Sequence, residues 1–274
     1  MNPYFVLLSF VFLLGTVSSS AKVPFDYVWG TAHHVLPETH SEESGYFSLC
    51  EGNDGRIFIG TSKYDHNAYL VEFDPVTEKQ RVAVDAHKVC GLTAKGYAAQ
   101  AKFHTRNYVG PSGIIYAGTK QGYAKKGDES EYPGGYLITY DPRNDTARNL
   151  GMPYEKQGIA DVVADESLGL IYVVTCEDRH WMLFDTATKK FTELGPMLTP
   201  YATTLMDAEG KAHALTKDFQ LATYDPVTKK VYRRPIGIGG KTFTRESRSS
   251  IPTWNLDADG RTAWLILMND AHLL

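Results

Sequence analysis

Four residues in one stretch of the sequence have the types and spacing needed for acid–base chemistry. They are His104, Arg106, Lys120 and Tyr123. A neutral imidazole accepts a proton and a phenol donates one, while arginine and lysine stabilise negative charge that develops during a reaction. A nearby ammonium also disfavours the imidazolium form, which leaves the imidazole available as a base. We therefore take these four as the candidate catalytic residues.

A second group of polar and aromatic residues falls at comparable places elsewhere in the chain, and we expect it to contact a ligand. The group consists of Tyr46, Tyr64, His66, Arg179, His180, Tyr201, Lys217, Arg245 and Arg248. It is rich in cations and aromatic rings and poor in carboxylates, so it favours an anionic ligand. A histidine at the start of a strand is often only a hydrogen-bonded structural residue, and that alternative stays open for His104.

A repeated hairpin signal indicates which elements must position these residues. A glycine opens a short β-rich run that ends in threonine six residues later, at Gly55–Thr61, Gly113–Thr119, Gly169–Thr175 and Gly210–Thr216. A fifth copy, Gly260–Ile266, lacks the threonine. An aromatic residue followed by aspartate ends the next strand of the first four copies, at Asp74, Asp141, Asp185 and Asp225. Aspartate caps such turns through nearby backbone N–H groups, so we interpret these four as turn residues.

The spacing of the repeats predicts an all-β fold. Successive repeat glycines are separated by 41 to 58 residues, which is room for four short strands and little else. Such a repeat favours a β-propeller of four-stranded blades over a sandwich or a barrel. The chain then holds about four and a half blades, with the last half at Pro252–Leu256 and Thr262–Leu267. We expect seven blades in the complete protein, the alternative being a five-bladed ring closed by an outer strand at Tyr27–Leu36.

Propeller geometry brings the candidate residues together. The starts of the innermost strands and the exits of the second strands open on the same face of a propeller, where loops commonly carry binding groups. His104 enters an innermost strand as Lys120 leaves the adjacent antiparallel one. We therefore expect the two side chains to be close neighbours at one rim.

The N-terminus and the composition restrict location and partners. Phe5–Leu14 is apolar and is followed by the small residues of Thr16–Ala21, which predicts a signal peptide over residues 1–21 and a propeller over residues 22–274. We expect a secreted or periplasmic protein without stable membrane insertion after cleavage. The net charge of -4 does not favour nucleic acid. Three cysteines, Cys50, Cys90 and Cys176, allow one disulfide and one free thiol.

No cofactor is identified by the sequence, although a divalent metal stays possible. His33, His34 and His40 lie near the N-terminus, and Cys176 precedes His180 by four positions. Neither group has a complete set of ligands at a recognised spacing. The sequence therefore leaves the metal open.

The blade 2 motif resembles secreted propellers of the oligogalacturonate and ulvan lyase type. The resemblance is carried by His104-Thr-Arg106, by Gly118-Thr-Lys-Gln-Gly-Tyr123 and by Tyr132-Pro-Gly-Gly135. It implies a seven-bladed enzyme that cleaves an acidic polysaccharide by β-elimination, with His104 as base, Tyr123 as acid, and Arg106 or Arg179 as the partner of the uronate carboxylate. The ulvan enzymes have a second histidine where this chain has Lys120, and the manganese-binding histidines of the oligogalacturonate enzymes are not found.

Three functions follow from these observations. The first is a polysaccharide lyase that acts on a uronate-containing glycan. The second is a propeller that binds an acidic polysaccharide, oligosaccharide or protein without cleaving it. The third, a calcium-dependent lactonase-like propeller, would need acidic or amide side chains at the inner strand starts, where this chain has Tyr46, His104, Ala160, Tyr201 and Ile251.

Overall fold

The computed structural model describes residues 29–43, 47–127, 131–238, 240–242 and 253–266. The compact unit considered below is formed by residues from His34 onward. The predicted signal peptide and the candidate residues Tyr46, Arg245 and Arg248 lie outside the described residues.

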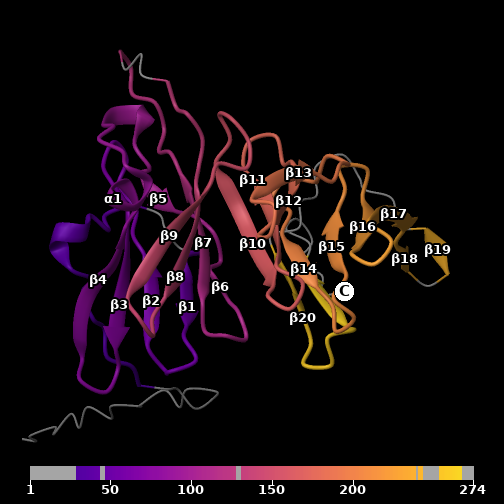
Figure 1. The fold of residues 1–274 in the computed structure, drawn as a ribbon, viewed down its shortest axis with the longest axis horizontal. Coiled ribbons are helices and arrows are strands. Elements are labelled where there is room, and N and C mark those ends of the chain that lie inside the picture. The colour runs from indigo at the N-terminus through magenta and orange to yellow at the C-terminus, as the bar shows by residue number, and fades with distance from the viewer. Residues whose placement is uncertain (1–28, 44–46, 128–130, 239, 243–252, 267–274) are drawn as a thin grey trace, which may run out of the picture. The chain divides into compact units, whose positions relative to one another are not determined.

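Three sheets have the simple strand order of a propeller blade, in which each strand pairs with the next one along the chain. Blade 1 contains β1 (Leu49–Glu51), β2 (Ile57–Gly60), β3 (Tyr69–Asp74) and β4 (Lys79–Asp85). Blade 3 contains β10 (Ile159–Asp165), β11 (Leu170–Thr175), β12 (Trp181–Asp185) and β13 (Lys190–Glu193). Blade 4 contains β14 (Thr204–Met206), β15 (Ala212–Leu215), β16 (Gln220–Asp225) and β17 (Lys230–Pro235). All neighbouring strands in these sheets are antiparallel (Figure 1).

Blade 2 differs because its innermost strand is split. Both β5 (Lys102–Phe103) and β6 (Tyr108–Val109) pair with β7 (Ile115–Lys120), which is followed by β8 (Leu137–Asp141) and β9 (Thr146–Gly151). Between the two halves, the Thr105 hydroxyl accepts a hydrogen bond from the Gly118 N–H at 3.0 Å, where a regular ladder would use a carbonyl. His104 and Arg106 lie in this interruption.

The beginning of a fifth blade completes the described strands. The strand β20 (Thr253–Leu256) pairs with β21 (Ala263–Ile266), after a small hairpin of β18 (Gly237–Ile238) and β19 (Lys241–Thr242). Within the described residues, these elements confirm the predicted all-β propeller with four complete blades and half of a fifth. Seven blades in the whole protein stays a prediction.

The turns between the outer strands are fixed by the aspartates of the repeat. Asp74 Oδ1 accepts hydrogen bonds from the N–H groups of Val76 at 2.9 Å and Thr77 at 3.2 Å. Asp185 and Asp225 make the same pair of bonds in blades 3 and 4. In each turn these bonds satisfy N–H groups that the sheet leaves free. The sequence interpretation of these aspartates as turn residues is therefore confirmed.

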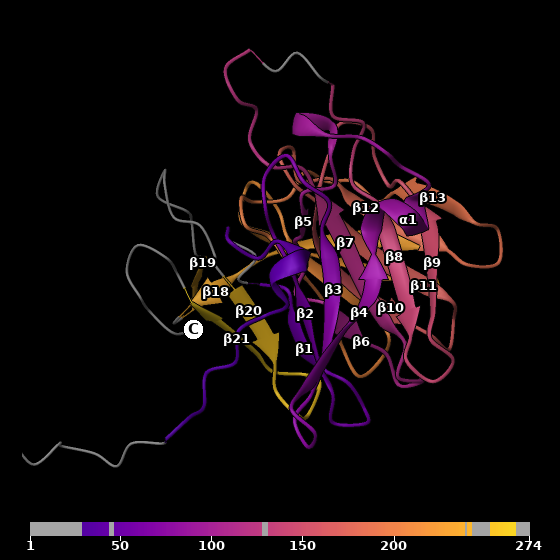
Figure 2. The same ribbon diagram turned by 90° about the vertical axis from the view of Figure 1, so that its left-hand side faces the viewer.

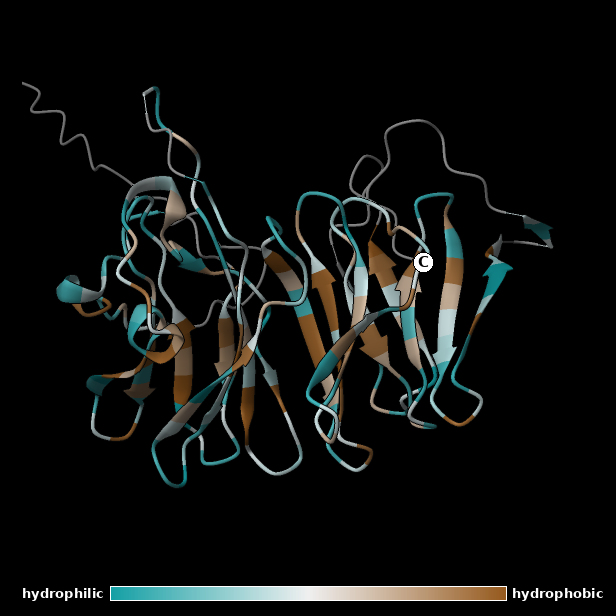
Figure 3. Cartoon of the chain, turned by 45° about the horizontal axis from the view of Figure 1, so that its top comes forward, coloured by the Kyte–Doolittle hydropathy of each residue, from teal (hydrophilic) through white to brown (hydrophobic). Residues whose placement is uncertain are grey.

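The blades pack face to face because the strands bury both of their faces. In β11, Ile171 and Val173 belong to an apolar cluster shared with blade 2, whereas Tyr172 and Val174 belong to a cluster shared with blade 4. Side chains alternate along a strand, so one apolar run supplies two interfaces. Similar clusters lie between blades 1 and 2 and between blade 4 and the fifth hairpin. Figure 2 shows blades 2 and 3 behind blade 1, and Figure 3 shows apolar residues concentrated on the strands.

Two glycines of the repeat let consecutive blades approach closely at the inner strands. A Cβ on Gly60 would lie 2.6 Å from Cβ of Phe103, and one on Gly118 would lie 2.4 Å from Cγ2 of Ile159. Both glycines directly precede the repeat threonine, so a position in the sequence repeat marks the contact between blades. The close contact at Gly118 also brings the backbone of β10 next to the residue that pairs with Gly118, which is His104.

One local expectation is wrong. The described part of the expected outer strand, Trp29–Leu36, has no regular secondary structure. Instead, the side-chain amide of Gln80 in β4 donates to His34 O at 2.7 Å and accepts from Leu36 N at 3.1 Å, so one side chain replaces a strand pairing.

A short helix of five residues, α1 (Ala86–Cys90), follows blade 1. Asp85 caps its N-terminus through Lys88 N, and Gly91 ends it in the left-handed conformation. In the part of the chain that the structure describes, none of the helices has the length and apolar character needed to cross a bilayer.

The Gly118→Ala substitution tests the close approach of blades 2 and 3. The added methyl group would overlap the Ile159 side chain, so we expect the free energy of unfolding to fall by about 1–3 kcal/mol. Urea unfolding followed by circular dichroism measures this loss. The control Gly30→Ala has open space around its Cβ position and should leave the midpoint unchanged. Equal midpoints for both variants would contradict the proposed contact.

Candidate functional site

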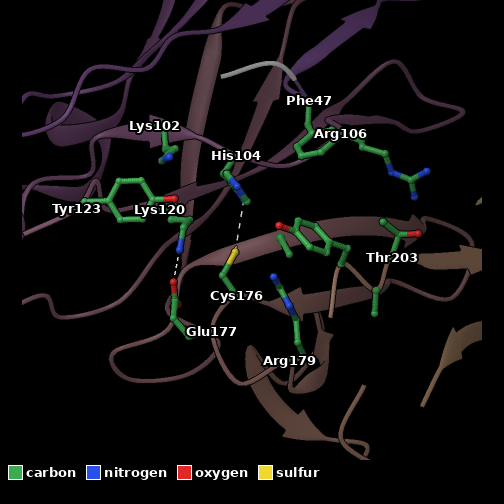
Figure 4. Close-up of a pocket in the computed structure, with 13 residues that line it drawn as sticks. Phe47, Lys102, His104, Arg106, Lys120, Tyr123, Cys176, Glu177, Arg179 and Thr203 are labelled. Carbon is green, nitrogen blue, oxygen red and sulfur yellow. Dashed lines mark hydrogen bonds and ion pairs between the residues drawn. The ribbon is translucent and has the colours of Figure 1, made fainter. Parts of the chain in front are cut away.

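A cavity of about 290 Å³ lies at the ends of the inner strands. Its volume is at the lower end of the range of about 300–1,000 Å³ for small-molecule pockets. Figure 4 shows the residues around it. They are Phe47, Lys102, His104, Arg106, Lys120, Tyr123, Ala160, Cys176, Glu177, Arg179, Tyr201, Ala202 and Thr203. The four candidate catalytic residues are among them, together with Arg179 and Tyr201.

The pairing of β5 with β7 places three basic side chains on one face. Lys102 lies directly opposite Lys120 in the antiparallel register, and His104 follows Lys102 by two positions. Residues two apart on a strand share a face, and directly opposed residues do as well. The structure therefore brings His104 and Lys120 together, as the hairpin geometry predicts, and adds Lys102 beside them.

Hydrogen bonding fixes the tautomer of His104. Its Nδ1 atom lies 3.1 Å from the carbonyl oxygen of Ile159, at the start of β10. A carbonyl only accepts, so Nδ1 carries the proton and donates it. Cys176 Sγ lies 3.4 Å from the same nitrogen. In the neutral ring the lone pair is therefore on Nε2, which has no hydrogen-bond partner among the described residues.

The surroundings of His104 also keep the ring uncharged. Burial, followed by the positive charges of Lys120 and Lys102, lowers the pKa of His104 to about 3. The Ile159 carbonyl partly opposes this shift, because it stabilises the protonated ring. At neutral pH the cavity therefore holds a neutral imidazole among cations.

Glu177 is the one carboxylate among the described residues that line the cavity. It forms an ion pair with the Lys120 ammonium, accepts a 3.4 Å hydrogen bond from Gln121 Nε2, and accepts a 3.1 Å bond from Gly158 N. Lys120 and Glu177 therefore largely neutralise one another. A ligand would meet Lys120 as part of an ion pair.

The guanidinium group of Arg106 is bound by acceptors of the protein itself. Its Nε and Nη2 atoms donate to the two oxygens of Asp161 at 3.0 and 2.8 Å, and the Asp161 side chain is fully buried. Its Nη1 atom donates to Trp254 O at 3.1 Å and to Asn255 Oδ1 at 3.0 Å. All three guanidinium nitrogens are thus in use, and Arg106 links blade 2 to blade 3 and to β20.

Two other cations in the cavity lack carboxylate partners among the described residues. The Lys102 ammonium lies 4.8 Å from the centre of the Tyr64 ring and 5.5 Å from that of Tyr123. The Arg179 guanidinium lies 5.8 Å from the centre of the Tyr201 ring and donates to Thr175 O at 3.3 Å. Each cation is therefore backed by tyrosine and stays available to an anion.

Several predicted binding residues lie elsewhere. His180 Nδ1 is 2.7 Å from Glu193 Oε1, and the ring stacks on Tyr154 at 3.8 Å. His66 contacts the ring of His40 at 4.8 Å, and neither His66 nor Lys217 lines the cavity. Tyr64 is adjacent to the cavity through its edge-to-face contact with Tyr123 at 5.1 Å.

The metal alternatives of the sequence find no support in the described residues. No group of three or more His, Cys, Asp or Glu side chains there could hold a metal ion. Cys176 contacts His104, whereas His180 is paired with Glu193. All three cysteines are free thiols. The part of the chain that the structure describes therefore does not provide the manganese-binding histidine cluster of the oligogalacturonate enzymes.

Sequence reasoning missed Lys102, Cys176 and Glu177 as part of the cavity. The signal for Lys102 was its register opposite Lys120, two positions before His104. Cys176 and Glu177 directly follow β11. Their counterparts in blade 2 are Lys120, the last residue of β7, and Gln121, which follows it. Phe47, whose ring makes an edge contact with His104 at 6.2 Å, gives no comparable signal.

Comparison with known proteins supports the fold. No protein-family model matches the sequence, and no curated protein is significantly similar to it. The chain is similar to the extracellular domain of a candidate one-component system from B. thetaiotaomicron, with 15% identity and a TM-score of 0.52 over 80% of this chain and 26% of that one. The chain thus spans about a quarter of the length of that protein.

Two further solved structures are similar at lower scores. A candidate gluconolactonase has 14% identity and a TM-score of 0.45 over 79% of this chain and 69% of that one. A protein of unknown function from Bacteroides thetaiotaomicron has 10% identity and a TM-score of 0.48 over 80% and 51%. At these identities the likeness concerns the fold alone.

The low pKa of His104 predicts a specific pH dependence of stability. An unfolded chain binds a proton at His104 near the ordinary pKa of 6.5, whereas the folded chain does so only near 3. Stability should therefore fall as the pH drops from about 6.5 towards 3, by up to about 1.4 kcal/mol per pH unit from this group. In His104→Gln this contribution is absent, so urea unfolding between pH 7 and pH 4 should show a shallower slope. Equal slopes would contradict a buried neutral imidazole.

The role of Arg106 predicts a loss of stability on its removal. Arg106→Met leaves the buried carboxylate of Asp161 without its counter-ion, and we expect unfolding to become easier by about 3–5 kcal/mol. Adding Asp161→Asn should recover part of this loss, because the remaining amide oxygen can still accept from Thr204 N. The exposed control Arg148→Met should stay within about 0.5 kcal/mol of the wild type. A loss no larger than that of the control would show that the pair contributes nothing.

Proposed function

We propose that this protein binds an acidic saccharide in the cavity and cleaves it by β-elimination, with His104 as the base. One observation carries the proposal: a neutral imidazole of fixed tautomer lies among Lys102, Lys120 and Arg179, with a single carboxylate beside them. Such a cavity favours an anion and offers it a proton acceptor. A secreted or periplasmic location, as the sequence predicts, suits a polysaccharide substrate.

The bond changes balance without any further reactant. Nε2 of His104 takes the proton from C5 of a uronate, the bond between C4 and the glycosidic oxygen breaks, and its electrons leave with the oxygen. The electrons of the C5–H bond form the C4=C5 double bond. The leaving oxygen takes a proton from the hydroxyl of Tyr123, a residue at the exposed edge of the cavity. General acid and base groups at such positions each accelerate a reaction by about 10²–10⁴-fold.

Arg179 is the better partner for the uronate carboxylate. The C5 proton becomes acidic enough to remove only when a cation stabilises the enolate-like charge that develops on the carboxylate. All guanidinium nitrogens of Arg106 already bind protein acceptors, whereas Arg179 has no carboxylate partner among the described residues. Of the two arginines suggested by the sequence resemblance, the contacts therefore favour Arg179.

The substrate itself would tune the base. Lys120, Lys102 and Arg179 all contribute to the low pKa of His104 in the free protein. A bound carboxylate offsets these charges, so the pKa of His104 rises when the anion is in place. A histidine that is neutral before binding thus becomes a stronger proton acceptor in the complex.

A protein that only binds an acidic glycan is the second candidate. The observation in its favour is that the Nδ1 hydrogen bond of His104 and its desolvation by the surrounding residues would equally suit a structural residue. The same cations would then hold the glycan without chemistry. Detection of cleavage products would distinguish the lyase from the protein that only binds the glycan.

The assay is the appearance of unsaturated, ultraviolet-absorbing products from polygalacturonate, from glucuronate-containing polysaccharides and from ulvan, with and without added Mn²⁺. Wild-type protein should produce them, and His104→Gln should reduce the rate by about 10²–10⁴-fold because the proton acceptor is lost. The control Lys190→Met alters an exposed residue of β13 and should leave the rate unchanged. Glycan retention with no absorbing product would favour the binding function.

A further inference from the structure

Lys102 is a buried cation without an acidic partner. Its side chain is 3% exposed, lines the cavity, and has no ion pair or hydrogen bond with a carboxylate among the described residues. Burial, followed by repulsion from Lys120, lowers its pKa. Glu43 and Glu177 partly oppose this shift, but neither forms an ion pair with Lys102. Lysine is almost never this buried unless it is paired, so the lack of a contacting carboxylate among the described residues points to an anion from outside.

Arg179 repeats this arrangement in blade 3. Its guanidinium lies over the Tyr201 ring and binds one backbone carbonyl, again without a carboxylate among the described residues. Tyr201 has a φ of 59°, which is an uncommon conformation for a bulky residue, and its side chain is 47% exposed. Strained backbone of this kind is concentrated at functional sites.

Lys102 and Arg179 lie on different sides of the cavity. Figure 4 shows Lys102 and Tyr123 on one side of His104 and Arg179 on the other. Lys120, which lies beside Tyr123 in the same view, is neutralised by Glu177. The charges left for a ligand are therefore the two outer ones, each next to an exposed tyrosine ring: Tyr123 is 66% exposed and Tyr201 is 47% exposed.

We propose that these two pairs, Lys102 with Tyr123 and Arg179 with Tyr201, form two acidic-sugar subsites on either side of His104. In each subsite the cation binds the carboxylate of one sugar, and the tyrosine ring packs against a face of the same sugar. The inference rests on the proposed function, since it assumes an acidic saccharide in this cavity. It adds that the smallest well-bound ligand has two neighbouring acidic sugars. Because Figure 4 shows the two cations on opposite sides of His104, we expect a single anionic group to engage only one of them.

Isothermal titration calorimetry at low salt tests the subsites. The probes are galacturonate, glucuronate and the dimers of each, and the His104→Gln background prevents cleavage. A charged hydrogen bond contributes about 1.5–3 kcal/mol, so we expect at least one dimer to bind about 10- to 100-fold more tightly than its monomer. Lys102→Met and Arg179→Met should each remove that gain, while Lys102→Arg should retain most of it.

Matched controls separate the subsites from general charge effects. Lys190→Met and Arg148→Met each remove one exposed cation that does not line the cavity, and both should leave dimer affinity unchanged. Circular dichroism checks that each variant is folded. The Lys102→Arg variant keeps the test valid if Lys102→Met fails to fold, since loss of affinity in a folded charge-preserving variant would argue against a simple charge contact.

The outcomes distinguish this inference from the proposed function. Equal affinity for monomer and dimer, or a dimer affinity that depends on only one of the two cations, would overturn the two-subsite inference and leave cleavage intact. A dimer held by both cations but never cleaved by the wild type would support the subsites and overturn the lyase. If none of the four sugars binds, both proposals fail.

Discussion

The close contact of β10 with β7 is the constraint on which the site depends. The absence of a side chain at Gly118 lets Ile159 approach, and the Ile159 carbonyl then lies within hydrogen-bonding distance of His104 Nδ1. That one bond between blades fixes the tautomer of the imidazole and the position of its ring. The same packing places Cys176 of blade 3 beside His104. The chemistry of the cavity is thus set by how two blades pack, since blade 2 by itself offers His104 no such partner.

Charge is distributed unevenly around this ring. Lys120 is matched by Glu177 and Arg106 by the buried Asp161, whereas among the described residues Lys102 and Arg179 contact tyrosine rings and form no ion pair with a carboxylate. The paired cations stabilise the connections between blades, and the unpaired ones leave a positive potential in the cavity. A propeller can combine the two roles because its rigid sheets hold the paired residues, while the other two line the cavity near the strand ends.

Most of the blade boundaries could be predicted because they depend on local chemistry. The aspartate turns require only the residue and the N–H groups that follow it, as at Asp74. The glycine that opens each repeat, six residues before the threonine, likewise marks the second strand. The outer strand expected at Tyr27–Leu36 could not be judged this way, because in its described part, Trp29–Leu36, the Gln80 side chain makes a long-range contact with His34 and Leu36 in place of strand pairing. The roles of Arg106 and Lys102 could not be predicted from the sequence either, since both depend on partners that are distant in sequence.

The sequence by itself determined the repeat, the all-β class, the turns and the meeting of His104 with Lys120, because strand alternation and hairpin register operate between near neighbours. Only the tertiary structure decided which cations are free. Arg106 and Arg179 look equivalent in the sequence, but Asp161 and β20 hold the first while Tyr201 lies under the second. Ion pairing depends on distances between blades, and the order of residues along the chain does not encode those distances in any local pattern.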